Sequence, residues 1–210
     1  MIYYPDDQDF ESCEGFTDYQ KVDYNGTRFY FKKDSADKVL IYYHGNAGSA
    51  CDRSYFRSTF EQSDASLIFI EYAGYSNDTQ RPSKELILKD VQNVQDFILQ
   101  RSFNDIIVYG QSIGSGAASY HTTIGDIDKL ILVTPFSDLD SLAQSKYRIY
   151  PASLLLREKY DNTIWLNDFD ARLLIVHGDR DFVIPLRFSQ ELFDSISSDN
   201  KEYELIEGKG

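Results

Sequence analysis

Five short apolar runs, none of which alternates with polar residues, constrain the fold of this 210-residue chain more than any other feature. They are Val39–Tyr43, Leu67–Tyr72, Ile106–Tyr109, Leu130–Val133 and Leu173–Val176, and Tyr203–Ile206 is a candidate last strand. Runs without alternation are typical of strands that are buried on both faces of a parallel sheet. We therefore expect a mostly parallel sheet at the centre of the molecule.

Segments with helical periodicity separate these runs. In Glu85–Leu99 the apolar residues recur every three or four positions, and Ser83 precedes them as a candidate helix cap. Phe188–Ile196 repeats the pattern more briefly. An alternation of strands and helices predicts a doubly wound α/β domain, with helices flanking the sheet.

An antiparallel hairpin is expected ahead of this domain core. Tyr19–Tyr24 and Thr27–Lys32 are strand-like and are joined by Asn25-Gly26, which suits a tight turn with positive φ. The residues before the hairpin are strongly acidic. We expect residues 1–18 to be a solvated, poorly packed lead-in, followed by a single domain over residues 19–210.

A cap insertion between late strands is expected at about residues 137–166, because this stretch is too long for a simple connection. Residues 141–160 are apolar and basic, although the whole chain has a net charge of −13. Two interpretations fit this composition: a surface helical insertion, or an apolar and locally basic entrance to a site.

Charge and composition exclude several classes of protein. A net charge of −13 repels phosphate backbones, which makes nucleic acid an unsuitable partner. No apolar run approaches the roughly 20 residues of a membrane-spanning helix, and the N-terminus does not resemble a signal peptide. Cys13 and Cys51 make neither a disulfide framework nor a metal motif. A reducing compartment such as the cytoplasm is the default expectation, and a single disulfide stays open.

Gly110-Gln111-Ser112-Ile113-Gly114 is the strongest candidate for a chemical site. It follows the strand Ile106–Tyr109 and precedes a helix of small residues, and G-x-S-x-G in this context is typical of a nucleophile elbow. The glycines permit a tight, strained turn that lifts the serine hydroxyl above the carboxyl end of the strand. The pattern predicts Ser112 as the nucleophile of an acyl-transfer reaction.

A small-residue loop, His44–Gly48, closes the strand Val39–Tyr43. Such a loop can aim backbone N–H groups at a developing oxyanion, and one such donor contributes about 2.7–4 kcal/mol in a transition state. We predict Asn46 N–H and Ile113 N–H as the oxyanion donors, with Ala47 as a second possibility for the first of them. His44 itself is expected to hold the loop.

The segment His177–Pro185 follows a late strand and supplies the candidate acid. An acid in this place can orient an imidazole and stabilise its charged form, and Asp181 is our choice. Asp138, which follows an earlier strand, is the rival. Asp179 is expected to fix the turn, and His177 to be a buried, hydrogen-bonded turn residue.

Five pieces in order resemble the serine α/β-hydrolases, closest to the serine aminopeptidase-like and acyl-protein-thioesterase-like branch. They are His44–Gly48, Glu71–Ser76, Gly110–Gly114, Thr134–Phe136 and His177–Pro185. The resemblance implies the α/β-hydrolase fold, the nucleophile Ser112, the acid Asp181 and no metal or organic cofactor. It implies cleavage of an ester, thioester or amide in a small molecule or an acylated protein or peptide. Ala73 stands where relatives more often carry Arg.

The expected general base is missing from the sequence, so the chain as written is expected to be a weak or inactive hydrolase. In this fold the histidine follows the acid, yet His44, His121 and His177 all precede Asp181, and Glu207–Gly210 ends the chain without the family's final helix. His121 is expected to be a surface or packing residue. One hypothesis is truncation, with a histidine beyond Gly210 and, upstream of Tyr3–Pro5, a membrane anchor in the parent protein. The alternative is a non-catalytic protein whose pocket binds a ligand or partner.

Overall fold

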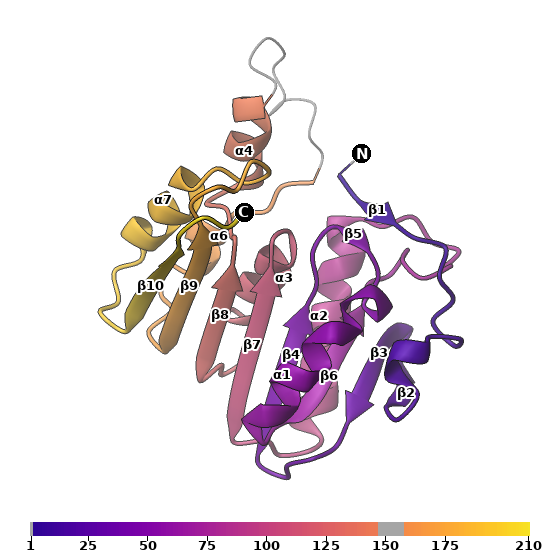
Figure 1. The fold of residues 1–210 in the computed structure, drawn as a ribbon. Helices are drawn as coiled ribbons and strands as arrows, with labels where there is room; N and C mark the ends of the chain where they lie inside the picture. Colours follow the sequence, from indigo (N-terminus) through magenta and orange to yellow (C-terminus); the bar gives the residue numbers. More distant parts are fainter. Residues whose placement is uncertain (1, 147–157) are drawn as a thin grey trace.

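The computed structural model describes residues 2–146 and 158–210. Its centre is an eight-stranded sheet with the order β10-β9-β8-β7-β4-β6-β3-β2 (Figure 1). All pairs among β4 and β6 to β10 are parallel, whereas β3 runs antiparallel to both β2 and β6. These strands are β2 Gln20–Tyr24, β3 Thr27–Lys32, β4 Lys38–Tyr43, β6 Ser66–Glu71, β7 Asp105–Gln111, β8 Lys129–Val133, β9 Arg172–Gly178 and β10 Lys201–Ile206. The predicted parallel sheet and N-terminal hairpin are confirmed.

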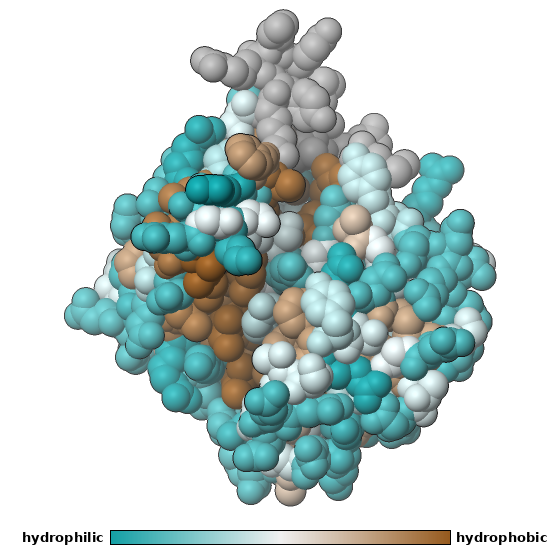
Figure 2. Space-filling view, viewed as in Figure 1, coloured by the Kyte–Doolittle hydropathy of each residue, from teal (hydrophilic) through white to brown (hydrophobic). Residues whose placement is uncertain are grey.

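The two faces of the sheet are covered unequally. β4 and β6 are buried along nearly their whole length, but burial alternates along β7, β8 and β9. The partly exposed residues of β8 and β9 form an apolar area, brown in Figure 2. They include Ile131, Val133, Leu174 and Val176. The prediction that β8 and β9 are buried on both faces was therefore wrong. The helices beside these strands pack on the opposite face alone, where Leu130, Leu132 and Ile175 join the core.

The described helices are α1 Arg57–Phe60, α2 Lys84–Leu99, α3 Gly114–His121, α4 Leu139–Lys146, α6 Asn162–Trp165 and α7 Arg187–Ser195. α2 begins as expected, since Ser83 Oγ accepts a hydrogen bond from Leu86 N at 3.3 Å. Its apolar face packs with Val39 and Ile41 of β4, while Phe60 of α1 packs with Leu40 and Tyr42. Since successive residues of a strand point to opposite faces, α1 and α2 cover opposite sides of β4.

Residues 2–18 pack against the domain more closely than their acidity predicted. β1 (Tyr4–Pro5) pairs in parallel with β5 (Ala47–Gly48), which lies in the loop after β4. Phe10 and Phe16 are buried, and the Phe16 ring stacks on Tyr30 with centroids 4.2 Å apart. The segment buries the rings of Tyr3, Phe10 and Phe16, while most of its acidic side chains stay at the surface.

A disulfide joins Cys13 to Cys51, with Cα atoms 5.9 Å apart. It links two short 3-10 helices, η1 (Glu14–Phe16) and η2 (Cys51–Phe56). The option of a single disulfide is thus realised, in place of the default of reduced thiols. The bond fastens the N-terminal segment to the region just after β5.

The expected cap at residues 137–166 contains α4 and α6. Asp161 caps α6 by accepting a hydrogen bond from Ile164 N at 3.1 Å. Residues 147–157, which carry much of the apolar and basic composition noted in the sequence, lie outside the described residues. Within the ranges that the structure covers, no helix is long and apolar enough to cross a bilayer.

Candidate active site

Ser112 occupies the corner between β7 and α3. Its φ is 54°, a left-handed value that is uncommon for residues other than glycine and costs backbone strain. Ser112 N donates to Val133 O of the neighbouring strand at 2.9 Å, and Ser112 O accepts from Ser115 N at 3.0 Å. The residue is partly exposed. The hydroxyl therefore belongs to a tightly held turn outside the hydrophobic interior.

The glycines on either side of this turn are sterically required. A Cβ added to Gly110 would lie 2.6 Å from Ala118 Cβ and 2.7 Å from Gly114 O. A Cβ on Gly114 would lie 2.3 Å from Tyr43 O. Neither position has room for a side chain, which is the physical reason that the sequence pattern predicted.

The loop after β4 passes directly beside Ser112. A Cβ built on Gly45 would lie 3.7 Å from Ser112 Cβ. Asn46 is partly exposed and Ala47 is exposed at the surface of the same loop. Ile113 precedes the first residue of α3, so the helix offers no carbonyl to its amide. The two predicted oxyanion donors thus come from segments that flank Ser112.

Four successive carbonyls of this loop each accept a hydrogen bond from the protein. His44 O accepts from the Tyr72 hydroxyl at 2.9 Å, Gly45 O from His44 Nδ1 at 2.7 Å, Asn46 O from the Tyr75 hydroxyl at 2.8 Å, and Ala47 O from Arg53 Nη2 at 2.7 Å. Because a trans peptide points its C=O and the next N–H in opposite directions, these bonds fix the direction of the loop amides. His44 holds the loop, as predicted. The roles of Tyr72, Tyr75 and Arg53 were missed, since nothing in the sequence shows which carbonyl a side chain will reach.

Arg28 was also missed by the sequence analysis. From β3 its guanidinium donates to Tyr75 O at 2.6 Å and to Ser76 O at 3.1 Å, and it lies 3.7 Å from Asp78 Oδ2. It thereby fastens the loop that carries Tyr75.

Asp181 lies after β9, at the same carboxyl edge of the sheet as Ser112. Its Oδ1 accepts hydrogen bonds from Val183 N at 2.7 Å and Ile184 N at 2.8 Å, and its side chain is 9% exposed. Its Oδ2 lies 3.8 Å from His177 Nε2. The carboxylate is thus held rigidly by its own turn. Its pairing with Ser112 in one reaction stays a prediction.

The two other acids considered have structural partners. Asp138 Oδ1 accepts from Ser141 N at 2.7 Å at the start of α4. Asp179 Oδ1 accepts from Gly208 N at 2.6 Å, which ties the turn after β9 to the chain beyond β10, as expected for a turn-fixing residue.

All three histidines are fully buried and engaged elsewhere. His121 Nδ1 meets the Tyr43 hydroxyl at 2.9 Å and its Nε2 meets Gln95 Oε1 at 2.8 Å, so it is a packing residue. His177 Nε2 donates to Ile184 O at 2.9 Å, as a buried turn residue would. Burial lowers the pKa of His121 to about 3 and also lowers the pKa of His177. Both rings thus have hydrogen-bond partners other than Ser112.

The last residues run back along the turn that carries Asp181. Arg180 N donates to Lys209 O at 2.8 Å. A Cβ on Gly210 would lie 2.8 Å from Asp181 N. Gly210 therefore lies against the backbone of the candidate acid. Across residues 2–146 and 158–210, no three His, Cys, Asp or Glu side chains gather as a metal site would require.

Comparisons with known proteins agree with this architecture. The model of the family described as alpha/beta hydrolase of unknown function (DUF1057) matches residues 23–140. The chain is 28% identical over 178 residues to the uncharacterised protein YfhR of Escherichia coli, covering 82% of this chain and 62% of YfhR. It is 27% identical over 182 residues to the lysophosphatidylserine lipase ABHD12 of Xenopus tropicalis, covering 74% of this chain and 46% of the lipase. The chain thus spans less than two thirds of the length of these relatives.

Among solved structures, an esterase from Pyrococcus furiosus superposes with a TM-score of 0.72 at 15% identity, covering 98% of this chain and 88% of the esterase. At this identity the likeness concerns the fold alone, and it confirms the predicted α/β-hydrolase fold. Since the family model matches more than half of the sequence, the chain belongs to the alpha/beta hydrolases of unknown function (DUF1057).

Proposed function

We propose that this domain is a serine hydrolase that transfers an acyl group to Ser112 and then to water. The observation that carries the proposal is the strained corner at Ser112, with φ 54°, at the carboxyl end of β7. A left-handed serine between two glycines that have no room for a Cβ, at a strand-to-helix turn, has the geometry of a nucleophile elbow, which supports a chemical role for the Ser112 hydroxyl. In this role Ser112 attacks the carbonyl carbon of an ester, thioester or amide.

The oxyanion of the tetrahedral intermediate would be stabilised by Asn46 N–H and Ile113 N–H. The closeness of Gly45 to Ser112 supports this assignment, as do the four bonded carbonyls that fix the loop. Preorganised amides of this kind are effective because they need no reorientation when charge develops.

In this proposal Asp181 would orient a histidine that residues 1–210 do not supply. The contact of Gly210 with the peptide between Arg180 and Asp181 supports this part of the proposal, because a residue attached to Gly210 would begin close to the turn that carries the acid. Such a histidine would take the Ser112 proton as general base and return it to the leaving group.

The substrate class we propose is an acyl ester with a polar or anionic head, as a small molecule or on a protein. The name of the relative ABHD12, a lysophosphatidylserine lipase, supports a lipid-like ester. The apolar and basic composition of residues 141–160 points in the same direction.

Imidazole rescue tests the mechanism with the 210-residue protein. We expect slow p-nitrophenyl acetate hydrolysis that free imidazole accelerates in the wild type beyond its effect on Ser112→Ala. Addition of a single His after Gly210 should raise the rate by about 10²-fold, the usual contribution of a general base, whereas addition of Gln should not. Ser115→Ala is the matched control, because Ser115 is a buried serine in the first turn of α3, just after the Ser112 corner. Equal rates in the wild type and Ser112→Ala under all conditions would exclude the hydrolase.

A second candidate is a non-catalytic binding module. The burial and engagement of His44, His121 and His177 favour it, since none of them is available as a base. In that case acyl compounds would bind without turnover, and neither imidazole nor an added histidine would produce hydrolysis.

A further inference from the structure

His44 controls the peptide that carries the proposed oxyanion donor. Its Nδ1 lies 2.7 Å from Gly45 O, and that carbonyl belongs to the same peptide unit as Asn46 N–H. The described chain has no cis peptide bonds, so the two groups point in opposite directions. A hydrogen bond from the His44 ring therefore reaches the same peptide unit as Asn46 N–H and opposes its rotation.

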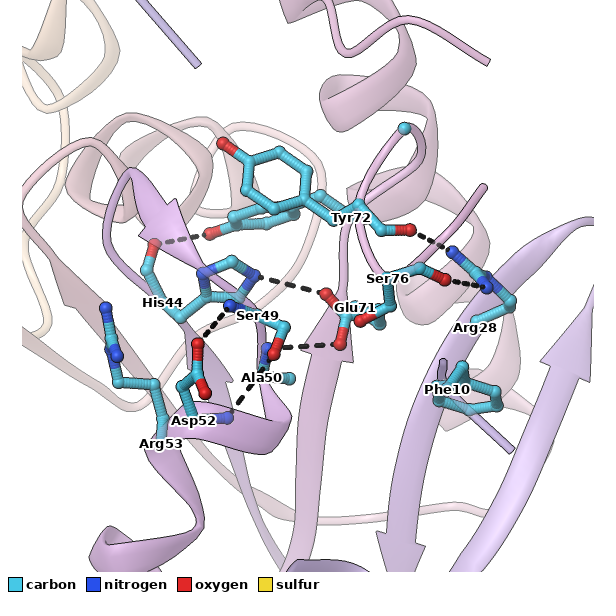
Figure 3. A network of polar contacts seen from close by, with 12 residues as sticks. Phe10, Arg28, His44, Ser49, Ala50, Asp52, Arg53, Glu71, Tyr72 and Ser76 are labelled. Atoms are coloured by element: carbon cyan, nitrogen blue, oxygen red, sulfur yellow. Dashed lines mark hydrogen bonds and ion pairs between the residues drawn. The ribbon is translucent and has the colours of Figure 1, made fainter. Parts of the chain in front are cut away.

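The protonation state of the ring follows from this contact. A carbonyl can only accept, so His44 Nδ1 carries the hydrogen and Nε2 of the neutral ring carries a lone pair. Figure 3 shows Nε2 directed at Glu71, with 3.7 Å between Nε2 and Oε1. Both side chains are 0% exposed, and neither of these two atoms has a hydrogen-bond partner within the described residues.

Two buried polar atoms that face each other without a hydrogen bond are costly, and one hydrogen between them would satisfy both. The gap needs to close only from 3.7 Å to about 2.8 Å. The other Glu71 oxygen, Oε2, already accepts from Ala50 N at 3.1 Å, which leaves Oε1 as the oxygen to carry the hydrogen. Burial raises the pKa of Glu71 to about 8 and lowers the pKa of His44 to about 3, which agrees with this neutral arrangement.

Charges around the pair have opposite signs. Arg28 favours the ionised form of Glu71 and Asp6 opposes it, while Asp52 and Arg53 act in opposite directions on His44. Tyr72 and Tyr75 pack on the His44 ring, and burial raises the pKa of both, so they remain neutral. The Ser76 hydroxyl and Ala50 N–H also favour the ionised form of Glu71, but by less than burial opposes it. Exclusion of water is thus the dominant influence on the pair.

We propose that His44 and Glu71 are positioning residues that share one hydrogen between His44 Nε2 and the Glu71 carboxyl, and that this pair sets the direction of Asn46 N–H. The catalytic meaning of the pair rests on the proposed function, in which Asn46 N–H stabilises the oxyanion. The existence of the pair does not depend on activity.

Nitrogen-detected NMR of the histidine rings tests the pair in the 210-residue protein. His44 is expected as the Nδ1–H tautomer, whereas His177, whose Nε2 donates to Ile184 O, is expected as the Nε2–H tautomer. Raising the pH through about 8 should shift both the His44 ring nitrogens and the Asn46 amide, as Glu71 loses its hydrogen. An Nε2–H tautomer at His44, or signals that stay constant between about pH 6 and pH 9.5, would overturn the proposal.

Variants of Glu71 separate positioning from mere packing. Glu71→Gln keeps a neutral donor towards His44 and should retain the Asn46 amide signal while abolishing its pH dependence. Glu71→Leu removes the donor and should move the Asn46 signal. His121→Gln is the matched control, because it disturbs a buried histidine elsewhere and should leave Asn46 unchanged. An Asn46 signal that is unaffected by Glu71→Leu would contradict the proposal.

A reactivity measurement then tests the catalytic link. In the extended chain with a histidine after Gly210, Glu71→Leu should lower the rate of fluorophosphonate reaction by about 10²-fold, with Glu71→Gln near wild type. A Glu71→Leu rate equal to wild type would overturn the link to the oxyanion. If no variant reacts while the NMR result holds, the pair stands and the proposed hydrolase function is the part that fails.

Discussion

Gly45 and Ser112 face each other across the candidate site, with 3.7 Å between Ser112 Cβ and the place where a Cβ of residue 45 would lie. This is an ordinary van der Waals distance. Gly45→Ala should therefore fold with a free energy of unfolding within about 1 kcal/mol of wild type, because alanine also restricts the unfolded chain. The added methyl group would nevertheless stand beside the nucleophile, and we expect it to slow acylation by bulky reagents.

Gly114→Ala is the informative contrast to that variant. Its Cβ would lie 2.3 Å from Tyr43 O, so strand β4 or the corner itself must move. We expect a loss of about 1–3 kcal/mol in the free energy of unfolding, measured by urea denaturation and larger than the change for Gly45→Ala. Equal stability of the two variants would show that the corner is looser than the structure describes.

The Cys13–Cys51 disulfide should contribute strongly to stability. It closes a loop with a sequence separation of 38, for which chain entropy predicts a contribution of about 4 kcal/mol. The Cys13→Ser/Cys51→Ser double variant should therefore unfold at a lower urea concentration than the wild type. Dithiothreitol should lower the urea midpoint of the wild type by a similar amount and leave the midpoint of the double variant unchanged. Identical urea midpoints with and without reductant would contradict a structural role for the bond.

From the burial of Asp90 we predict an unusual dependence of the free energy of unfolding on pH. Asp90 is buried on α2, where it accepts hydrogen bonds from Thr27 Oγ1 at 2.7 Å and Ala73 N at 2.8 Å, and burial raises its pKa to about 7. Between the unfolded pKa of about 3.9 and this value, the folded state binds more protons than the unfolded state. The stability from Asp90 is therefore complete at low pH and is lost as the pH rises to about 7, with a slope of at most about 1.4 kcal/mol per pH unit.

Asp90→Asn isolates this contribution, because asparagine has a similar shape and does not titrate. Urea denaturation at a series of pH values should show a smaller decline for the variant than for the wild type between about pH 4 and pH 7. If the free energy of unfolding fell equally with pH in the two proteins, Asp90 would be ionised in the folded state.

Periodicity predicted most of the fold, because buried strands and amphipathic helices leave a direct pattern. Leu130–Val133 became all but the first residue of β8, and Glu85–Leu99 became all but the first residue of α2. The packed N-terminal segment was not predictable in this way, since acidic residues hide the aromatic rings between them. Pairing of Cys13 with Cys51 depends on two loops meeting in space, which spacing cannot show.

The candidate site, like the fold, was predictable where it depends on local sequence and not where it depends on long-range contacts. Ser112, with its two glycines, follows from one local turn, so five consecutive residues were enough to place it. The contacts of Glu71 with His44 and of Arg28 with the Tyr75 loop join segments that are distant in the sequence. From the sequence alone, both Glu71 and Arg28 could equally have been charged residues at the surface. Long-range hydrogen bonds of this type need the assembled sheet.

The most direct test of the central claim is the site of covalent labelling by a fluorophosphonate, identified by peptide mass spectrometry on the chain with a histidine added after Gly210. We predict a phosphonyl adduct on Ser112. In Ser112→Ala we expect the protein to be labelled at a background rate only. An adduct on a different residue, or none on Ser112 under conditions that label an authentic serine hydrolase, would contradict the account.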